Sequence, residues 1–351
     1  MKIAILSLYL PSGSKIGVGY QVHYLANALT RRGHDVTVYS QSGPPDDARY
    51  PVVVPPIRRH LRTFRFAWDL RAYDFSRYDV VHACGDDWFL WGKPRRRLVH
   101  TYMGSCLAEM FHASAGREKL RMAALAACET TSSLLADCRV AISENTRRFV
   151  PNIQYVIPCG IDIDAFRPNG PRSTAPSILF VGTMHGRKRG YFLQDIFIRH
   201  VRPHVPDAEL WMVCEEPAEG PGIVSHGRVG LDHLIRLYRQ AWVFCLPSTY
   251  EGFGVPYIEA MAAGAVVVAS PNLGAKEVTG DGRFGLLAAD HQLAEMLTRT
   301  LQDEPLRHHY QTAGLAHARD YGWERVCQEY EQVYAGDEPE ANPSTTKEMI
   351  P

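Results

Sequence analysis

Residues 241–270 read AWVFCLPSTYEGFGVPYIEAMAAGAVVVAS, and they contain a strand, a loop, a short helix and a second strand. The apolar runs AWVFCLP and AVVVAS predict buried strands, because an interior strand of a parallel sheet is apolar on both faces. Between them, Pro256 suits a first helical position and Gly264 suits the cap beyond the helix end. This stretch predicts an α/β fold.

The same alternation of strand and helix patterns runs along most of the chain, which implies crossover units and parallel sheets. A turn-rich passage, NIQYVIPCGIDIDAFRPNGPRSTAPS, interrupts it at residues 152–177 and suits an interdomain connection. We expect two doubly wound, Rossmann-like domains at residues 1–160 and 161–320, with an interdomain cleft where ligands bind. The remainder is expected to be a helix at 321–335 that returns to the first domain, and a disordered tail at 336–351.

Composition excludes several classes of protein. The chain has 351 residues, with Lys+Arg 38 against Asp+Glu 38, so no global basic field points to nucleic acid. Its cysteines are scattered without a C-x-x-C pair, which argues against a zinc site and a disulfide framework and fits a reducing cytoplasm. No apolar run is long enough to span a membrane, and the N-terminal run predicts a first strand, not a signal peptide. We expect a cytoplasmic monomer or homodimer without a metal site, at most peripheral at the inner membrane face.

Two glutamates, Glu251 and Glu259, flank the glycine-rich turn of the opening stretch. We expect the amides of Gly252, Phe253 and Gly254, at a positive helix end, to attract a phosphate. A carboxylate accepts two hydrogen bonds from neighbouring hydroxyls, as a sugar or a ribose offers. The order of Glu251, the glycine amides and Glu259 along the chain matches the order of sugar, diphosphate and ribose in a nucleoside diphosphate sugar, with Glu251 on the sugar and Glu259 on the ribose. The alternative is that Glu259 is a favourable charge in the first helical turn and Glu251 a solvated loop residue.

The stretch resembles the E-x7-E signature of the retaining glycosyltransferases of family 4, which have the GT-B fold. The similarity continues through GHDVTVYS, YDVVHA, CRVAISE, VIPCGIDIDAF, ILFVGTMHGRKRG and KEVTGDGRFGLL. It implies that Glu251 and Lys188 are catalytic, with Lys188 neutralising the diphosphate and Arg187 or Arg189 sharing that work. The donor-binding residues it implies are Gly17, Gly19, Gly182, Thr183, Arg187, Lys188, Gly252, Phe253, Gly254, Val255 and Glu259.

The chain departs from the family pattern at two positions. The family usually has Arg where this chain has Thr183, and His where it has Met103. The resemblance places Met103, Tyr20 and Glu277 in the region of the acceptor and donor sugar. An ordinary exposed charge is the alternative for Glu277, and His82 is expected to be a hydrogen-bonded structural residue.

A glycine loop, SGSKIGVGYQ at residues 12–21, is a second phosphate candidate, because glycine lets backbone approach a ligand closely before a helix. The dinucleotide fingerprint needs G-x-G-x-x-G, but Gly17 and Gly19 are followed by Val22 at the third position. The second strand also ends in Ser40 where an acidic residue would hold a ribose. An NAD enzyme is therefore disfavoured.

A basic and aromatic stretch, IRRHLRTFRFAWDLRAYDF at residues 57–75, is followed by KPRRR at 93–97. It could lie on an anionic membrane or receive an acidic acceptor, and the alternative is a solvated helix face with its aromatic residues turned inward.

Taken together, the sequence predicts a retaining glycosyltransferase of the hexosyltransferase class. Its donor would be a UDP-sugar or a GDP-sugar, with no further cofactor. The acceptor hydroxyl could belong to an aminocyclitol or other natural product, an inositol lipid or a glycan. The alternatives are a GT-B-fold epimerase or phosphorylase and a non-catalytic sugar-nucleotide-binding subunit.

Overall fold

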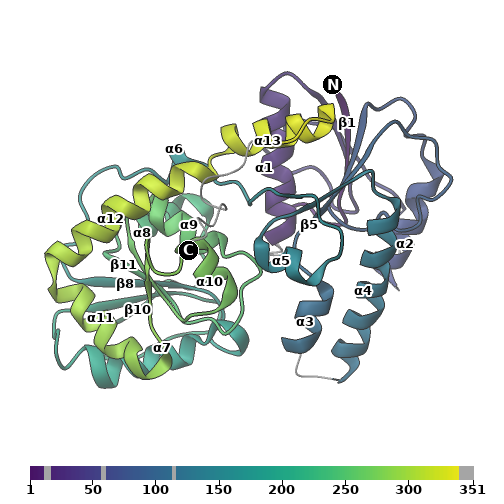
Figure 1. Ribbon diagram of the computed structural model, residues 1–351. Coiled ribbons are helices and arrows are strands. Elements are labelled where there is room, and N and C mark those ends of the chain that lie inside the picture. The colour runs from purple at the N-terminus through teal and green to yellow at the C-terminus, as the bar shows by residue number, and fades with distance from the viewer. Residues whose placement is uncertain (12–16, 57–60, 113–115, 340–351) are drawn as a thin grey trace, which may run out of the picture. The chain divides into compact units, whose positions relative to one another are not determined.

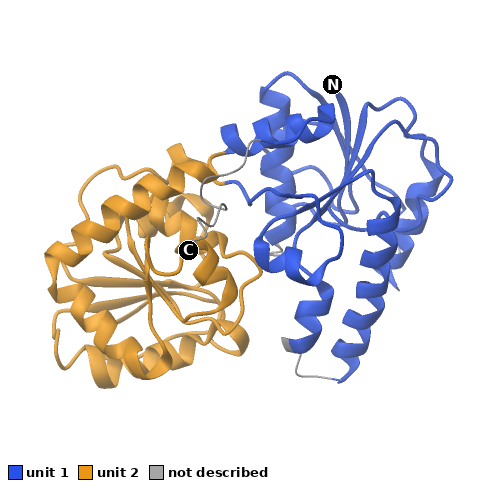
Figure 2. Cartoon of the chain, viewed as in Figure 1, with its two compact units in different colours: residues 1–160, 323–341 blue, residues 161–322, 342–351 orange. Residues whose placement is uncertain are grey.

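The computed structural model describes residues 1–11, 17–56, 61–112 and 116–339, and it divides the chain into two units (Figure 1, Figure 2). Unit 1 contains Met1–Gly160 and the helix α13 (Trp323–Ala335), and unit 2 contains Ile161–Gly322. Most of the expected tail, residues 340–351, lies outside the described residues. No helix among the described residues is long and apolar enough to cross a membrane.

Unit 1 is built on a parallel sheet with the strand order β3-β2-β1-β4-β5-β6-β7. The chain winds outward from β1 in both directions, so neighbouring strands β1 and β4 form the switch point of a doubly wound fold. The strands are β1 (Lys2–Leu6), β2 (Asp35–Tyr39), β3 (Val52–Val53), β4 (Val80–Ala83), β5 (Leu98–Tyr102), β6 (Cys138–Ala141) and β7 (Tyr155–Val156).

Helix α1 (Gly17–Arg31) shows why these segments fold as they do. Its buried residues Val22, Leu25, Ala26 and Leu29 recur at helical spacing and pack against the apolar strands of the sheet. The other helices of unit 1 before α13 are α2 (Arg62–Asp69), η1 (Leu70–Ala72), α3 (Cys106–His112), α4 (Gly116–Leu135) and α5 (Glu144–Phe149).

Helix α13 joins the core of unit 1 although it ends the described chain. Its apolar side chains, including Tyr330 and Tyr334, belong to the same buried cluster as β1 and α1. Buried His82 on β4 bonds the Tyr334 hydroxyl through Nδ1 at 2.6 Å and the Thr101 hydroxyl through Nε2 at 2.7 Å. Burial lowers the pKa of His82 to about 3, so it stays neutral. The structural role predicted for His82 is confirmed.

Unit 2 repeats the topology with the order β10-β9-β8-β11-β12-β13, again with every pairing parallel. Its strands are β8 (Ser177–Val181), β9 (Glu209–Val213), β10 (Ile223–Ser225), β11 (Val243–Leu246), β12 (Val266–Ala269) and β13 (Leu286–Leu287). Its helices are α6 (Ile163–Phe166), η2 (Gly186–Lys188), α7 (Gly190–Ile196), η3 (Phe197–Val201), α8 (Leu231–Gln240), α9 (Val255–Ala262), α10 (Leu273–Val278), η4 (Asp290–Gln292), α11 (Leu293–Gln302), α12 (Glu304–Ala318) and η5 (Arg319–Tyr321).

The predicted fold class of two doubly wound α/β domains is confirmed. The passage at 152–177 is more than a connection, because it contains β7 and α6 and supplies buried Ile157 to the core of unit 1. Asp162 in this passage caps α6 by accepting a hydrogen bond from the amide of Ala165 at 2.9 Å.

Candidate active site

The candidate active site lies at the carboxyl edge of the unit 2 sheet, where three loops follow neighbouring strands. One loop follows β8, one follows β11 and one follows β12, and β8 and β11 are the strands at which the winding direction reverses. Open α/β sheets bind ligands at such switch points. The predicted residues Lys188 and Glu251 come from the first two of these loops.

Glu251 is the centre of a buried ion pair. Only 6% of its side chain is exposed, and its Oε1 accepts a hydrogen bond from Lys188 Nζ at 2.6 Å. Its Oε2 accepts a bond from Arg187 Nη1 at 3.1 Å. Burial lowers the pKa of Lys188, and the charges of Glu251 and Glu259 oppose that shift. The alternative of a solvated Glu251 is therefore wrong, because the structure brings both carboxylate oxygens into contact with cations.

The β8 loop is shaped to present Lys188. A side chain at Gly182 would lie 3.0 Å from the Phe180 ring and 3.1 Å from Lys188 Cβ, so glycine lets the lysine stem pack closely there. Arg189 has a left-handed backbone with φ of 55°, which costs energy in a residue with a side chain. Its guanidinium binds the Pro247 carbonyl at 2.6 Å and both Asp290 carboxylate oxygens at 2.7 Å. Arg189 thus anchors the loop, and its charge is already neutralised by Asp290.

Glu259 lies near this ion pair on the adjacent helix α9. The helix begins at Val255, so Glu259 is in its second turn and the predicted first-turn position is wrong. Burial raises the pKa of Glu259 to about 7, although Tyr238 and Lys188 hold it down. The hydroxyl of buried Tyr238 has no hydrogen-bond partner of good geometry among the described residues. Glu259 is therefore a half-buried carboxylate whose pKa lies near neutrality.

The glycine turn between the two glutamates is tightly packed. Gly254 caps α9 with a left-handed φ of 106°, and a side chain there would clash with the ring of Tyr257 at 2.5 Å. Phe253 is buried and its ring contacts Tyr321, whereas Gly252 and Val255 are half-buried. At the other end of α9, Gly264 has φ of 73° and donates to the Met261 carbonyl, which confirms the predicted cap.

Two residues after β12 support this turn and were not predicted from the sequence. Asn272 is buried, caps α10 through the amide of Ala275 at 2.9 Å, and donates to the Ser248 carbonyl at 3.0 Å. A side chain at Gly274 would lie 2.6 Å from the Glu251 carbonyl oxygen and 3.0 Å from Glu251 Cβ. The only signal for these residues was the three-residue pattern of a capped helix, N-x-G, separated from a buried strand by two residues.

Gly274→Ala should displace the loop that carries Glu251. The added methyl group has no space against backbone oxygens, so we expect a loss of about 1–3 kcal/mol in the free energy of unfolding. A shift approaching 1 Å at reacting groups should also lower transfer by about tenfold to 100-fold. Urea unfolding and steady-state transfer rates measure the two effects. Gly230→Ala is the matched control, because a side chain there meets nothing within 4 Å, and equal behaviour of the two variants would contradict the packing described.

The remaining predicted residues divide between the units. Thr183 is exposed and its hydroxyl donates to the His185 carbonyl at 2.8 Å, and Glu277 is half-buried on α10 in unit 2.

The predicted residues that belong to unit 1 are Gly17, Gly19, Tyr20 and Met103. A side chain at Gly19 would lie 3.1 Å from the Leu10 backbone, whereas one at Gly17 would meet nothing within 4 Å. Met103 packs against the core of unit 1. Residues 12–16, the first half of the predicted glycine loop, lie outside the described residues.

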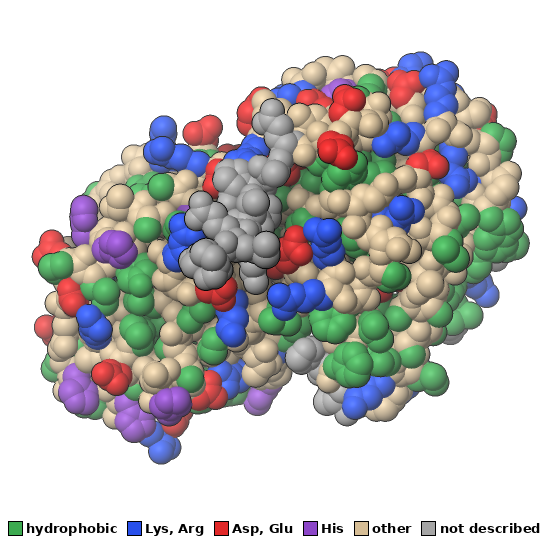
Figure 3. Space-filling view, viewed as in Figure 1, with side chains coloured by type: hydrophobic (Ala, Val, Ile, Leu, Met, Phe, Trp, Pro, Cys, Tyr) green, Lys and Arg blue, Asp and Glu red, His purple; other side chains and the backbone are tan. Residues whose placement is uncertain are grey.

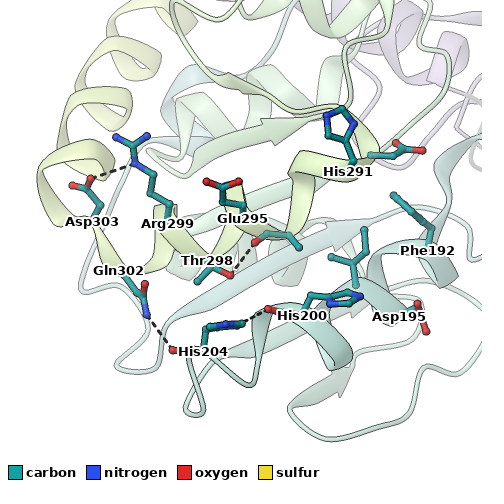
Figure 4. A pocket seen from close by; sticks show the side chains of 13 residues that line it. Phe192, Asp195, His200, His204, His291, Glu295, Thr298, Arg299, Gln302 and Asp303 are labelled. Carbon is teal, nitrogen blue, oxygen red and sulfur yellow. Dashed lines mark hydrogen bonds and ion pairs between the residues drawn. The ribbon is translucent and has the colours of Figure 1, made fainter.

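A hollow of about 940 Å³ elsewhere in unit 2 contains none of the predicted residues (Figure 4). It lies between the α7–η3 segment and α11, and His200, His204 and His291 are among its lining residues. It contains Asp290, the anchor of Arg189, but neither Lys188 nor Glu251. Across the described parts of the chain, no group of three or more His, Cys, Asp and Glu residues is arranged to hold a metal ion.

Two family models match successive parts of the chain. Residues 16–165 match the model described as Glycosyltransferase Family 4, and residues 175–303 match Glycosyl transferases group 1. A D-inositol 3-phosphate glycosyltransferase of Corynebacterium diphtheriae is 25% identical over 95% of this chain and 94% of the relative. A phosphatidyl-myo-inositol mannosyltransferase of Mycobacterium tuberculosis is 31% identical over 56% of this chain and 58% of the relative.

Solved structures show the same architecture. Sucrose-phosphate synthase from Thermosynechococcus elongatus superimposes with a TM-score of 0.77 at 20% identity, covering 95% of this chain and 98% of that one. Anabaena HepE in complex with UDP and glucose has a TM-score of 0.74 at 16% identity, covering 96% and 100%. With two parallel-sheet α/β units and both family models, the predicted enzyme class is confirmed: the chain is a glycosyltransferase with the GT-B fold.

Proposed function

We propose that the chain is a retaining glycosyltransferase of family 4 that moves a hexosyl group from a nucleoside diphosphate sugar to a hydroxyl acceptor. The observation that carries the proposal is the buried Glu251 held between Lys188 and Arg187 at the switch point of unit 2. A carboxylate and two cations beside a glycine turn offer the groups that a sugar diphosphate requires.

Each residue has a role in this proposal. The Lys188 ammonium stabilises negative charge on the departing diphosphate, and Arg187 supplies further charge in place of the arginine missing at Thr183. Glu251 orients both cations and uses its remaining lone pairs for the sugar hydroxyls. Glu259 accepts hydrogen bonds from the nucleotide ribose. Attack by the acceptor oxygen breaks the bond from the anomeric carbon to the phosphate oxygen, and a donor phosphate oxygen takes the acceptor proton.

The substrates are proposed by class. A UDP-sugar is the favoured donor and a GDP-sugar the alternative. The first half of the chain is proposed to bind the acceptor. Two of the relatives are named for inositol compounds, which supports an acceptor with a polyhydroxylated ring, although a natural product or a glycan shares that chemistry.

The experiment is to incubate the protein with UDP-sugars and GDP-sugars and a panel of hydroxyl acceptors, cyclitols included. We expect nucleoside diphosphate release that depends on the acceptor, a product heavier by one hexosyl unit, and an unchanged anomeric configuration by NMR. An altered sugar formed without any acceptor would indicate an epimerase, and an inverted product would contradict the proposed mechanism.

A further inference from the structure

The side chain of Arg189 ties together the ends of four strands of unit 2. Arg189 lies between η2 and α7, directly after Lys188. Its Nε donates to the carbonyl of Pro247, which follows β11, at 2.6 Å. Its Nη2 donates to the hydroxyl of Ser270, which follows β12, at 3.0 Å. Both Nη atoms donate to the carboxylate of Asp290, which follows β13, at 2.7 Å. Arg189 therefore connects the carboxyl ends of β8, β11, β12 and β13, which are neighbours in the sheet.

The backbone of Arg189 is left-handed, with φ of 55° and ψ of 44°. A residue with a side chain keeps such a conformation only where the surrounding contacts determine it. Here the contacts are made by the guanidinium, which also lies 4.3 Å from the centre of the Phe192 ring. Two of the four hydrogen bonds described above end on Asp290. The conformation of Arg189 therefore depends more on Asp290 than on any other of these partners.

Lys188 shares this segment of backbone, so the left-handed turn after it sets the direction of its side chain. On its other side, the carbonyl of Arg187 accepts a hydrogen bond from the amide of Thr249 at 2.9 Å. Lys188 is thus held between two tethered residues, with its Nζ 2.6 Å from Glu251 Oε1. A relaxed turn at Arg189 would carry the ammonium away from this carboxylate.

The ion pair between Asp290 and Arg189 is suited to orientation more than to stability. The side chain of Asp290 is 55% exposed, and solvent screens an ion pair at such a position. Two parallel hydrogen bonds between a guanidinium and a carboxylate nonetheless fix their relative direction. The hydrogen bonds from Arg189 lower the pKa of Asp290, so the carboxylate stays ionised around neutral pH.

Asp290 lines the hollow between the α7–η3 segment and α11. The space-filling view shows histidine side chains gathered on the part of unit 2 that carries these helices (Figure 3). Asp195 lines the same hollow and forms a 2.7 Å ion pair with Arg199, with 54% of its side chain exposed. The two aspartates match in exposure, in pair length and in surroundings, but Arg199 lies on η3 and not in the β8 loop. Asp195 is therefore a matched control for Asp290.

We infer that Asp290 is a positioning residue for sugar transfer. By holding Arg189 in the left-handed turn, Asp290 keeps the Lys188 ammonium directed at Glu251 and at the diphosphate of the donor. The role of Lys188 in this inference rests on the proposed function. The arrangement of Asp290, Arg189 and Lys188 needs no substrate, so it can be tested separately from transfer.

Asp290→Ala should lower the kcat of transfer by about tenfold to 100-fold, because a catalytic group misplaced by about 1 Å can cost 100-fold. The KM for the donor should change less, since the lost interaction strengthens in the transition state. Asp290→Glu keeps a carboxylate and should recover most of the lost kcat. Asp195→Ala should keep the wild-type kcat, and an equal loss in this control would overturn the inference.

A double-mutant cycle separates positioning from general damage to the fold. In a Lys188→Ala background, Asp290→Ala should lower kcat by no more than about twofold, because the group that Asp290 positions is absent. A loss as large as in the wild-type background would overturn the inference, since Asp290 would then act independently of Lys188.

Crystal structures of the free protein give a readout that does not depend on transfer. In Asp290→Ala, Arg189 should leave the left-handed region, and Lys188 Nζ should lie beyond about 3.5 Å from Glu251. In Asp195→Ala both features should stay as in the wild type. An unchanged pair between Lys188 and Glu251 in Asp290→Ala would overturn the inference whatever the activity of the chain. A displaced pair in this variant, with no transfer by the wild type, would support the positioning of Lys188 while contradicting the proposed function.

Discussion

Lys188→Ala is expected to lower the kcat of sugar transfer by about 10²–10³, a loss typical of removing one group that stabilises charge developing in a transition state. Lys188 is the better shielded of the two cations on Glu251, with 17% of its side chain exposed. In the proposed mechanism its charge would therefore act on the diphosphate through little water. Steady-state kinetics with saturating donor measure the effect, because the expected loss is in kcat more than in KM.

Arg187→Ala is the matched control for this prediction. Arg187 binds the same carboxylate, but at 3.1 Å and with 52% of its side chain exposed. Solvent screening should limit its loss to about tenfold or less. Equal losses in the two variants would contradict the assignment of Lys188 as the principal cation, and unchanged kinetics in both would remove the catalytic site from this loop.

Glu259→Gln is expected to stabilise the free protein while weakening nucleotide binding. The pKa of Glu259 is about 7 in the folded chain, against an ordinary value of 4.5. Between these two values the folded state holds a proton that the unfolded state has lost, so this residue lowers the free energy of unfolding as pH rises through that window. At about pH 8, removing this half-buried charge should therefore raise the free energy of unfolding by about 1–3 kcal/mol.

Nucleotide affinity should rise with pH, whereas the free energy of unfolding falls. If the ionised carboxylate accepts the ribose hydroxyls, UDP binding strengthens as pH rises through about 7, and Glu259→Gln flattens that profile with a loss of about tenfold at high pH. Thermal unfolding across the pH range and calorimetric titration with UDP measure the two effects. A variant that is destabilised at high pH, or that binds UDP with the wild-type profile, would contradict this account.

The strong sequence patterns predicted the interior of the fold. Long apolar strands such as β1, β8 and β11 appear where the runs KIAILSLYL, ILFVGT and AWVFCLP place them. The two-residue edge strands β3, β7 and β13 were missed, because so short a run carries no periodicity. Edge strands of this length exist only through pairing with a neighbour, which the sequence of the strand itself does not encode.

The sequence indicated which residues are candidates for the site, but it did not indicate which of them contact each other. The spacing of Glu251 and Glu259 and the basic run at 187–189 indicated segments that the structure brings together. The ion pair between Glu251 and Lys188 depends on the adjacency of β8 and β11, which are far apart in sequence. The contrast between Arg187, which binds Glu251, and Arg189, which binds Asp290, follows from a left-handed turn that three consecutive basic residues do not reveal.

A crystal structure of the chain with bound UDP tests the central claim most directly. We predict that the ribose hydroxyls contact the Glu259 carboxylate and that the diphosphate lies against Lys188 Nζ and the glycine turn at 252–254. A nucleotide seated in the hollow beside α11, or anywhere else remote from Lys188 and Glu259, would contradict the account.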